Sequence, residues 1–427
     1  RLVIALIVTF FFAGCKSSFK SNFRDFNAYY NTFFNAKKSY NLGEEKSENQ
    51  ARKYNTLLPI RIHETPLGAG SGDFQNAIDK GADILRKYDE TKWVDNSLEI
   101  IGKSYFYRKE YFSADQKFDE LYLSTDDKVL KQRAVFWKGR VLLELQAYNQ
   151  AIQYLSDQLT FFDGEWEDDL DFQVKAVLAQ NYVERENWVI ALDLLNESVK
   201  KLSRKAYRER GYFLIGQLNE VLGNNEAAFD AYGQVTKHYT IYELQFEAQK
   251  KRAEVARILG KSDDAYKVFS SMVRDDKNTE FVAELNFELG KTEQERGNSE
   301  KAKKIYINIL RDRRSKPDAV TKAKVYNGLA EISRFYENNY TFAAAYYDSA
   351  SKINAPEREL PEDFKAKEFA QSFGEYASIK NEIYEQDSLL WLGMLPQAEF
   401  DSVLVELERK KREEIARLQK EQEERRN

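Results

Sequence analysis

The sequence predicts an all-α chain in which one helical hairpin is repeated about seven times, and two observations carry this prediction. A small residue recurs in the first helix of each predicted hairpin, and an alanine recurs at a fixed interval in the second. No proline falls between Leu67 and Lys316, so nothing interrupts helix formation there. Because one hairpin cannot bury its apolar face alone, successive hairpins are expected to stack into a solenoid.

The stretch from Trp93 to Leu121 is the first complete copy and defines the spacing. Gly102 lies in its first helix, Ala114 in its second, and the bulky Phe118 one turn after the alanine. Small residues at such positions let two helix backbones approach closely. The interval of 12 residues from Gly102 to Ala114 is that of the tetratricopeptide repeat; it recurs in the first six copies and becomes 13 in the seventh. The sequence therefore predicts a right-handed tetratricopeptide-repeat superhelical solenoid over residues 93–355.

The predicted packing positions form two series, one for each helix of the hairpin. Those of the first helices are Gly102, Gly139, Ala179, Gly216, Ala253, Gly290 and Ala330. Those of the second helices are Ala114, Ala151, Ala191, Ala228, Ala265, Ala302 and Ala343. Successive copies begin 37, 40, 37, 37, 37 and 40 residues apart, so the extra residues are expected between hairpins.

Residues 1–14 are predicted to be a lipoprotein signal peptide. Leu2 to Ala13 form an apolar run that is short for a bilayer span, and Gly14 precedes Cys15, the only cysteine. We expect cleavage before Cys15 and acylation of its thiol; the alternative is a plain secretory signal with a leftover cysteine. The chain has no initiator Met and stops inside a charged helix, so it is expected to be part of a longer protein.

Residues 15–92 are predicted to form aromatic helices that lead into the repeats, followed by a Gly/Pro hinge. The aromatic residues that fall on one helix face are Phe19, Phe23, Phe26, Tyr30 and Phe33. This face is expected to pack on the first repeats or, alternatively, to contact the membrane surface beside the anchor. Residues 43–58 are charged and are expected to form a helical return. The glycine run at 68–72 lacks the lysine of a phosphate loop and is interpreted as a hinge.

Beyond the repeats, residues 356–395 are predicted to form capping helices and residues 396–427 a charged, truncated helix. Pairs of opposite charge four residues apart, such as Glu408 and Arg412, support the last helix in solvent. The apolar positions of this helix are too sparse for a coiled coil; they are Leu404, Leu407, Ile415 and Leu418.

The composition and the scarcity of reactive side chains argue against catalysis. The net charge is −5, from 65 basic and 70 acidic residues of mixed distribution, which does not suggest a nucleic-acid binder. Only His63 and His238 are present, so no metal site from clustered His and Cys is expected. The acidic loop at 163–171 lacks the glycine and glutamate of a helix-loop-helix calcium site and is interpreted as a solvated insertion. We expect no catalytic residue, cofactor, metal or small-molecule substrate.

A protein partner is expected instead, on the concave face that the first helices line. This surface mixes phenylalanines with charged and amide side chains and fits an extended or helical protein segment. It lacks the asparagines with which chaperone-binding repeats grip a terminal carboxylate. The candidate contact residues are Lys103, Phe106, Phe136, Arg140, Phe213, Gln217, Lys250, Phe287 and Lys291. The alternative for each is solvation or packing between repeats.

Three stretches together resemble one known family. They are FNAYYNTFFNAKKSY at 26–40, KWVDNSLEIIGKSYFYRKEYF at 92–112 and DSLLWLGMLPQAEFDSVL at 387–404. They are similar to the SprE/PorW-type lipoproteins of Bacteroidota, tetratricopeptide proteins of the outer membrane needed for type IX secretion and gliding motility. The resemblance implies a lipid anchor on the periplasmic face of the outer membrane and protein partners in the cell envelope. Known members of that family are longer than this sequence and carry a further C-terminal region.

Two other readings stay open. One is an outer-membrane assembly lipoprotein of the BamD type, whose usual array is shorter than seven repeats. The other is a glycan-binding lipoprotein of the SusD type, which needs a large insertion for which the nearly continuous repeats leave no room. The favoured hypothesis is a non-enzymatic, lipid-tethered scaffold.

Overall fold

The computed structural model describes residues 24–26, 28, 32–237, 241–312, 316–361 and 363–426; in the last helix, side chains are described for 397–417 and 419. The regular structure of these residues is helical, with no strand among them. The predicted all-α tetratricopeptide-repeat fold is thereby confirmed. Cys15, His238 and the aromatic residues at 19, 23 and 30 lie outside the described residues.

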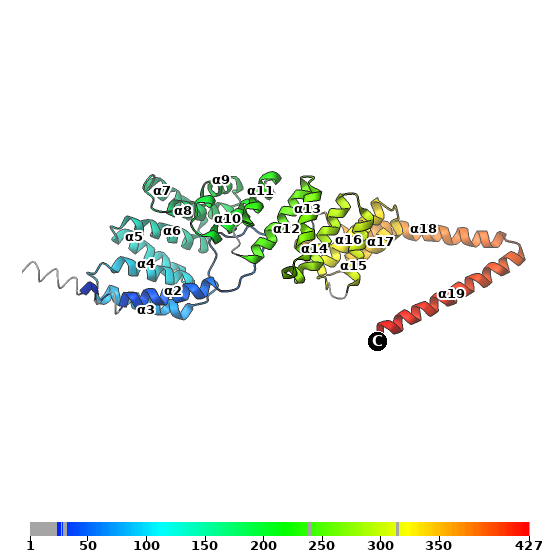
Figure 1. Ribbon diagram of the computed structural model, residues 1–427, viewed down its shortest axis with the longest axis horizontal. Helices are drawn as coiled ribbons and strands as arrows, with labels where there is room; N and C mark the ends of the chain where they lie inside the picture. Colours follow the sequence, from blue (N-terminus) through cyan, green and yellow to red (C-terminus); the bar gives the residue numbers. More distant parts are fainter. Residues whose placement is uncertain are drawn as a thin grey trace, which may run out of the picture. The chain divides into compact units, whose positions relative to one another are not determined.

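The helices follow one another in antiparallel pairs (Figure 1). Their bounds are α2 Phe34–Glu48, α3 Ser71–Lys87, α4 Val94–Tyr107, α5 Tyr111–Ser124, α6 Lys128–Glu144, α7 Tyr148–Phe161, α8 Leu170–Glu184, α9 Trp188–Ser198, α10 Lys205–Val221, α11 Asn225–Val235, α12 Tyr242–Ile258, α13 Ser262–Arg274, α14 Val282–Glu295, α15 Ser299–Arg311, α16 Ala319–Phe335, α17 Tyr340–Ser351, α18 Ala366–Met394 and α19 Gln397–Arg426. Short 3₁₀ turns span Val199–Lys201, Asp276–Phe281 and Glu357–Glu359.

The chain divides into two compact units, and the boundary falls within α13. Unit 1 ends at Val268 and contains the hairpins α4/α5, α6/α7, α8/α9 and α10/α11, preceded by α2 and α3. Unit 2 begins at Phe269 and contains the hairpins α14/α15 and α16/α17, followed by α18 and α19.

Each hairpin turns at a residue in the left-handed backbone region. In the first six copies this residue lies seven positions after the small residue of the first helix, and the six are Lys109, Gln146, Glu186, Gly223, Gly260 and Gly297. The next amide donates to the carbonyl five residues back, as in the bond from Glu110 N to Tyr105 O at 2.9 Å. This is the Schellman termination of a helix, which satisfies carbonyls that the helix leaves unpaired. The same turn in the first six copies explains their constant interval of 12 residues inside the hairpin.

The bulky residue of each second helix packs on the small residue of the first. A Cβ atom added to Gly102 would lie 2.8 Å from the ring of Phe118, and one added to Gly216 would lie 2.5 Å from Tyr232. Gly139 has the same relation to Leu155. In unit 2, Gly290 has this relation to Tyr306. The predicted packing positions in both series are buried. Any larger residue at these glycines would displace a fully buried side chain.

The expected helical return over residues 43–58 is wrong. Helix α2 continues to Glu48, and residues 49–70 then connect it to α3 without a helix. Gly68 and Gly70 end this connection in the left-handed region, with φ of 108° and 79°. A Cβ atom at Gly70 would lie 2.6 Å from the carbonyl oxygen of Gly43, so the glycine permits a close backbone approach to α2.

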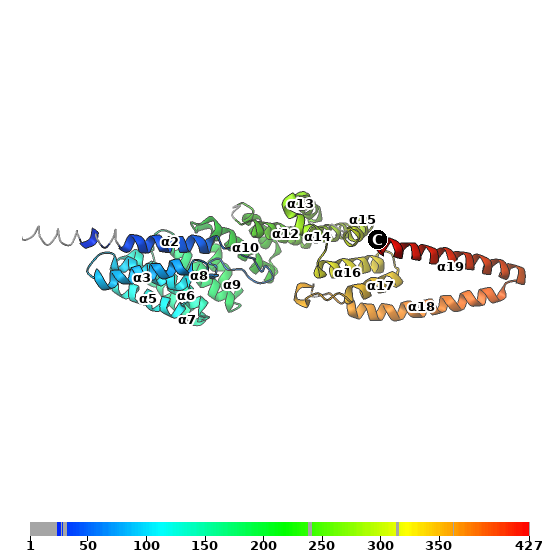
Figure 2. The same cartoon turned by 90° about the horizontal axis from the view of Figure 1, so that it is seen from below.

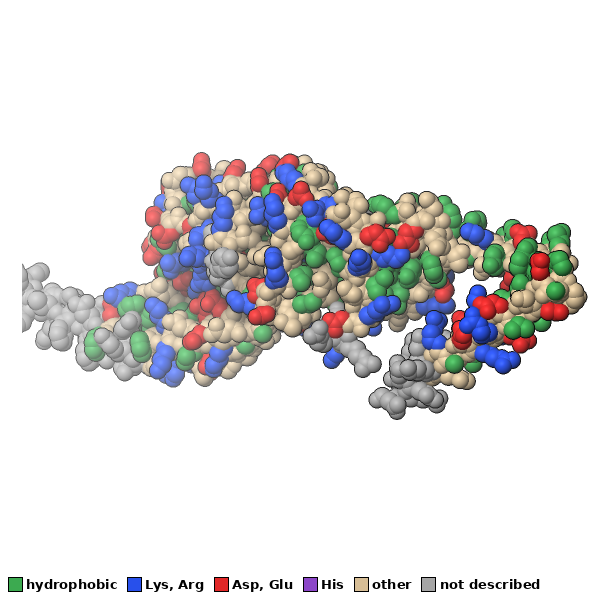
Figure 3. Space-filling model, turned by 45° about the vertical axis from the view of Figure 1, so that its right-hand side comes forward, with side chains coloured by type: hydrophobic (Ala, Val, Ile, Leu, Met, Phe, Trp, Pro, Cys, Tyr) green, Lys and Arg blue, Asp and Glu red, His purple; other side chains and the backbone are tan. Residues whose placement is uncertain are grey.

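In unit 2, the first part of α18 covers the last hairpin and the remainder extends past it (Figure 2). Phe369 and Phe373 contact the ring of Tyr347, with centroids 5.1 and 6.0 Å apart. Hydrophobic side chains farther along α18 and on α19 are exposed (Figure 3), and they include Ile379, Ile383, Leu390, Trp391, Met394 and Val405. None of the described helices has the length and hydropathy required to cross a bilayer.

Candidate functional site

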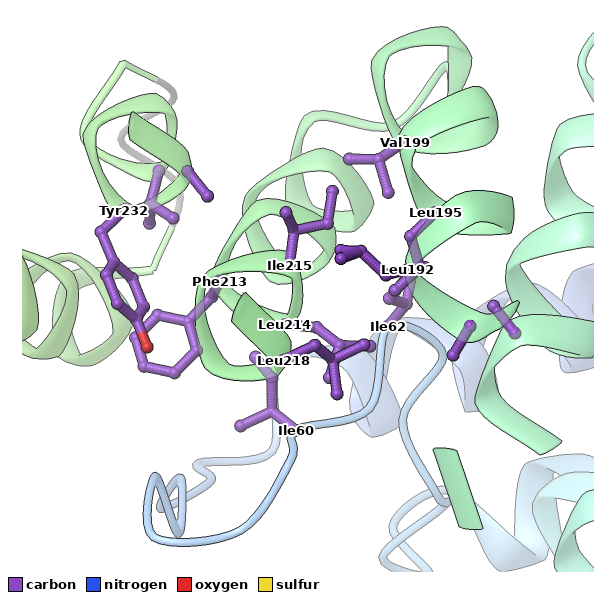
Figure 4. Packing of buried hydrophobic residues seen from close by; sticks show 14 of the residues in the cluster. Ile60, Ile62, Leu192, Leu195, Val199, Phe213, Leu214, Ile215, Leu218 and Tyr232 are labelled. Atoms are coloured by element: carbon purple, nitrogen blue, oxygen red, sulfur yellow. The ribbon is translucent and has the colours of Figure 1, made fainter. Parts of the chain in front are cut away.

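The feature that organises unit 1 is an extended part of the connection between α2 and α3. Residues 52–65, here called the groove segment, run across the first helices α6, α8 and α10 of three consecutive repeats. Figure 4 shows Ile60 and Ile62 on this segment beside the helices that carry Leu218 and Leu195. The residues of α6, α8 and α10 that bind this segment lie 76 to 161 positions away from their partners in sequence.

Three equivalent helix positions hold the backbone of the groove segment. Each is the residue directly after the small packing residue of its repeat. Gln217 of α10 accepts the Ile60 N–H at 2.9 Å, and Gln180 of α8 accepts the Ile62 N–H at 3.3 Å. Arg140 of α6 donates to the carbonyl of Glu64 at 3.2 Å. An extended chain presents the same edge every second residue, so one position per repeat meets residues 60, 62 and 64 in turn.

Further donors complete this set of backbone contacts. The amide nitrogen of Gln217 donates to the carbonyls of Leu58 at 2.8 Å and Thr56 at 3.1 Å. Arg210 donates through Nε to the carbonyl of Ile62 at 2.7 Å. Buried backbone groups that lack a partner are costly, and here helix side chains replace the neighbouring strand that a sheet would provide.

The side chains of the groove segment enter the core of unit 1. Ile62 is fully buried and Ile60 nearly so, within the cluster that includes Phe213 and Leu214 of α10. Burying such side chains contributes on the order of 1.5–3 kcal/mol each. His63 lies between the rings of Phe136 and Tyr207, with centroids 5.1 and 4.6 Å away.

Charge complementarity fixes Arg61 between two helix ends. Its guanidinium pairs with Glu144, the last residue of α6, and with Glu184, the last residue of α8, both at 2.9 Å. Helix C-termini favour cations because their carbonyls point outward. Burial lowers the pKa of Arg61, but the two carboxylates outweigh it, so that this pKa is raised above its usual value.

A cleft of about 620 Å³ lies beside the groove segment, between it, the end of α2 and α10. Several of the charged groups that line it form ion pairs. Glu64 pairs with Arg52 and Arg210, both at 3.4 Å, and Arg204 pairs with Glu48 at 2.7 Å. No group of His, Cys, Asp and Glu that could hold a metal ion occurs in the described part of the chain. The side chains of α6, α8 and α10 hold the groove segment of the same chain by backbone hydrogen bonds, apolar burial and ion pairs.

The structure places the predicted partner-contact residues in different environments. Arg140 and Gln217 hold the groove segment, Phe136 contacts His63, and Phe213 lies in the core beneath Ile60 and Ile62. Phe106 is fully buried. Lys103 and Lys250 are half-buried and pair with Glu99 and Glu247. In unit 2, Phe287 stacks on Tyr306 and Lys291 is exposed. Contact between these residues and a partner stays a prediction.

The selection of candidate contact residues missed part of the groove. It left out Arg210 and the carboxylates of Glu144 and Glu184. It also missed the groove segment itself. The available signal was the alternation of Ile60 and Ile62 between Pro59 and Pro66, which is typical of an extended chain.

His63 gives the stability of unit 1 a defined pH dependence. Burial, together with the positive charges of Arg140, Arg210 and Arg204, holds its pKa well below the usual 6.5. The ring is therefore neutral in the folded chain, whereas in the unfolded chain it takes up a proton below pH 6.5. Because the unfolded state then binds more protons, the free energy of unfolding falls as the pH falls.

We expect the protonation of His63 in the unfolded chain to lower the free energy of unfolding by about 1.4 kcal/mol when the pH falls from roughly 7.5 to 5.5. Denaturant unfolding of the wild type and of His63→Phe at the two pH values measures it. The substituted chain should lack this part of the pH dependence, and His238→Gln serves as the matched control. Equal pH dependence in the wild type and His63→Phe would show that His63 is not buried in its neutral form.

Comparison with known proteins adds little beyond the fold. No protein-family model matches the chain, and no curated protein matches it. A tetratricopeptide repeat protein from Parabacteroides merdae is 14% identical and covers 65% of this chain and 98% of its own, with a TM-score of 0.37. The apo form of RapI is 13% identical over 88% of this chain and 98% of its own, with a TM-score of 0.48. NprR in complex with its cognate peptide NprX is 15% identical over 76% of this chain and 99% of its own, with a TM-score of 0.34.

Structures with so low a sequence identity and TM-score support no statement about the function of this chain. The helical hairpins and their turns define an array of the tetratricopeptide type, a class that serves as a scaffold for protein–protein interaction.

Proposed function

We propose that this chain is a non-enzymatic scaffold that binds a protein partner in the groove lined by α6, α8 and α10. The observation that carries the proposal is the repeated use of one helix position, at Arg140, Gln180 and Gln217, to hold an extended backbone. Side chains that bind backbone groups at regular spacing are suited to an extended polypeptide and not to a small molecule.

We further propose that the scaffold is anchored by lipid at the periplasmic face of the outer membrane. The apolar stretch before Cys15 supports an anchor, since it combines a short hydrophobic run with small residues ahead of a single cysteine. The resemblance of residues 26–40, 92–112 and 387–404 to SprE/PorW-type lipoproteins supports a role in type IX secretion and gliding motility. The partners would then be proteins of the cell envelope.

Fractionation of cells that carry Cys15→Ser tests the anchor. The substituted chain should move from the membrane fraction to the soluble periplasm, whereas Ser17→Ala should stay with the membrane. Membrane association of Cys15→Ser would remove the lipid anchor from the proposal.

Deletion of the gene in its native host tests the role in the envelope. We expect loss of type IX secretion and of gliding, restored by the wild-type gene and not by Cys15→Ser. Normal secretion together with defective insertion of outer-membrane barrels would instead favour the assembly reading. Normal secretion and normal barrels would contradict both.

A further inference from the structure

We infer that the groove of α6, α8 and α10 takes an extended partner segment with the order aliphatic, basic, aliphatic, aromatic, and that the groove segment occupies it as an internal stand-in. The inference deepens the proposed scaffold function and rests on it. The partner gains access to the groove by displacing residues 52–65.

The side chains of the groove bind mainly backbone groups of the segment that occupies it. Gln217, Gln180, Arg140 and Arg210 each bind an amide or carbonyl group of the segment, and Arg210 also pairs with the carboxylate of Glu64. Any chain that can run extended in the same register offers the same groups every second residue. The helix side chains therefore do not require this particular segment.

The surroundings of Ile60, Arg61, Ile62 and His63 define which side chains the groove accepts. The pockets of Ile60 and Ile62 accept aliphatic side chains, and Glu144 and Glu184 select a basic residue between them. An acidic residue at that point would meet two carboxylates, one of which is almost enclosed. The next pocket lies between the rings of Phe136 and Tyr207 and suits an aromatic side chain.

The groove segment leaves buried polar atoms of this site without hydrogen-bond partners in the part of the chain that the structure describes. His63 is buried in the aromatic pocket, yet neither ring nitrogen has a hydrogen-bond partner among the described residues. The amide nitrogen of Gln180 is also buried without a partner in the described structure, whereas the same group of Gln217 binds two carbonyls. Buried polar groups without partners are destabilising, so a segment with an apolar ring at the fourth position would fit better.

The connection to the rest of the chain permits release of the segment. Residues 49–70 contain no helix that would have to unfold, and the left-handed Gly68 and Gly70 end the connection. Leu57 and Leu58 remain exposed at the other end of the bound stretch. A tethered occupant competes at a local concentration on the order of millimolar, so a free segment must bind more tightly than residues 52–65 in order to replace them.

Peptide binding to the purified full chain tests the inference. The probe is a fluorescent peptide of residues 54–66 carrying His63→Phe, and the comparison peptides are the unchanged sequence, Arg61→Glu and a scrambled order. The receptors are the wild type and a variant in which residues 56–65 are replaced by a Gly-Ser linker of equal length. Fluorescence anisotropy gives the affinities, and circular dichroism checks that each receptor is folded.

We expect the linker variant to bind the His63→Phe peptide at least about tenfold more tightly than the wild type does, because the internal competitor is gone. The unchanged peptide should bind the linker variant more weakly than the His63→Phe peptide. The Arg61→Glu peptide should bind about tenfold more weakly still, and the scrambled peptide should not bind. No binding of the His63→Phe peptide to a folded linker variant would overturn the inference.

A second receptor covers the case in which the linker variant does not fold. Arg61→Ala keeps Ile60 and Ile62 in the protein but removes both ion pairs, so it should bind the His63→Phe peptide several-fold more tightly than the wild type. Equal affinities would overturn displacement.

A concentration-dependent dimer of the linker variant that the peptide does not dissociate would assign the groove to a second copy of the chain. If the peptides fail to bind but deletion of the gene abolishes secretion and gliding, the inference about the groove is rejected and the envelope role stands. If the peptides bind as expected but deletion has no effect, only the envelope role is rejected.

Discussion

Replacement of Tyr232 by alanine should lower the free energy of unfolding of unit 1 by about 3–5 kcal/mol, the usual cost of removing a buried aromatic side chain. Tyr232 is fully buried in α11, where its ring covers Gly216 of α10 and meets Phe213 edge-on at 5.3 Å. Because the ring fills the space that Gly216 leaves open, its removal leaves a cavity between α10 and α11. Denaturant unfolding monitored by circular dichroism measures the loss.

Tyr232→Phe is the matched control for this prediction. It keeps the ring and removes only the hydroxyl group, which donates a hydrogen bond to the carboxylate of Glu220. We expect a cost of about 0.5–1.5 kcal/mol, since Glu220 also pairs with Lys251 and keeps that partner. Equal losses for the two variants would mean that the hydroxyl group, and not the packing of the ring on Gly216, joins α10 to α11.

Replacement of Ile62 by alanine is expected to cost about 2–5 kcal/mol, although Ile62 belongs to no helix. Its side chain has no exposed surface and lies in the core cluster with residues of α9 and α10. The free energy of unfolding of unit 1 measures the cost. Hydrogen exchange at the amides of residues 60 and 62, which donate to Gln217 and Gln180, should accelerate as the groove segment loosens.

Leu58→Ala provides the control for the Ile62 prediction. Leu58 lies in the same segment, but 62% of it is exposed, so its truncation should change stability by no more than about 0.5 kcal/mol. If Leu58→Ala and Ile62→Ala lower the free energy of unfolding equally, the cost at Ile62 does not come from its burial in the core. An unchanged stability in Ile62→Ala would contradict the burial of residue 62 in the core.

The repeats could be predicted because their determinants are local. A glycine and an alanine 12 residues apart specify a hairpin, and a bulky residue one turn later fills the space that the glycine leaves. The turn could have been found as well, since Gly223, Gly260 and Gly297 occupy its left-handed position in three consecutive copies. In the first three copies the same turn cannot be recognised from the sequence, because residues of these types rarely adopt a positive φ. The residues at the turn there are Lys109, Gln146 and Glu186.

The occupation of the groove could not be predicted in the same way. Residues 43–58 carry a charge pattern compatible with a helix, and the alternation of Ile60 and Ile62 between two prolines indicates an extended chain but not the helices that it contacts. What holds residues 58–64 in place is a set of side chains on α6, α8 and α10, none of which is near them in sequence. Of the residues expected on the groove, Arg140 and Gln217 do lie there, facing the chain's own backbone.

The sequence by itself therefore determined the all-α repeat and the packing positions, since both follow from residue spacing within one hairpin. Only the tertiary structure decided what lies on the concave side of α6, α8 and α10. That outcome depends on bringing together residues more than 75 positions apart, whose backbone hydrogen bonds and ion pairs form only after the repeats have stacked.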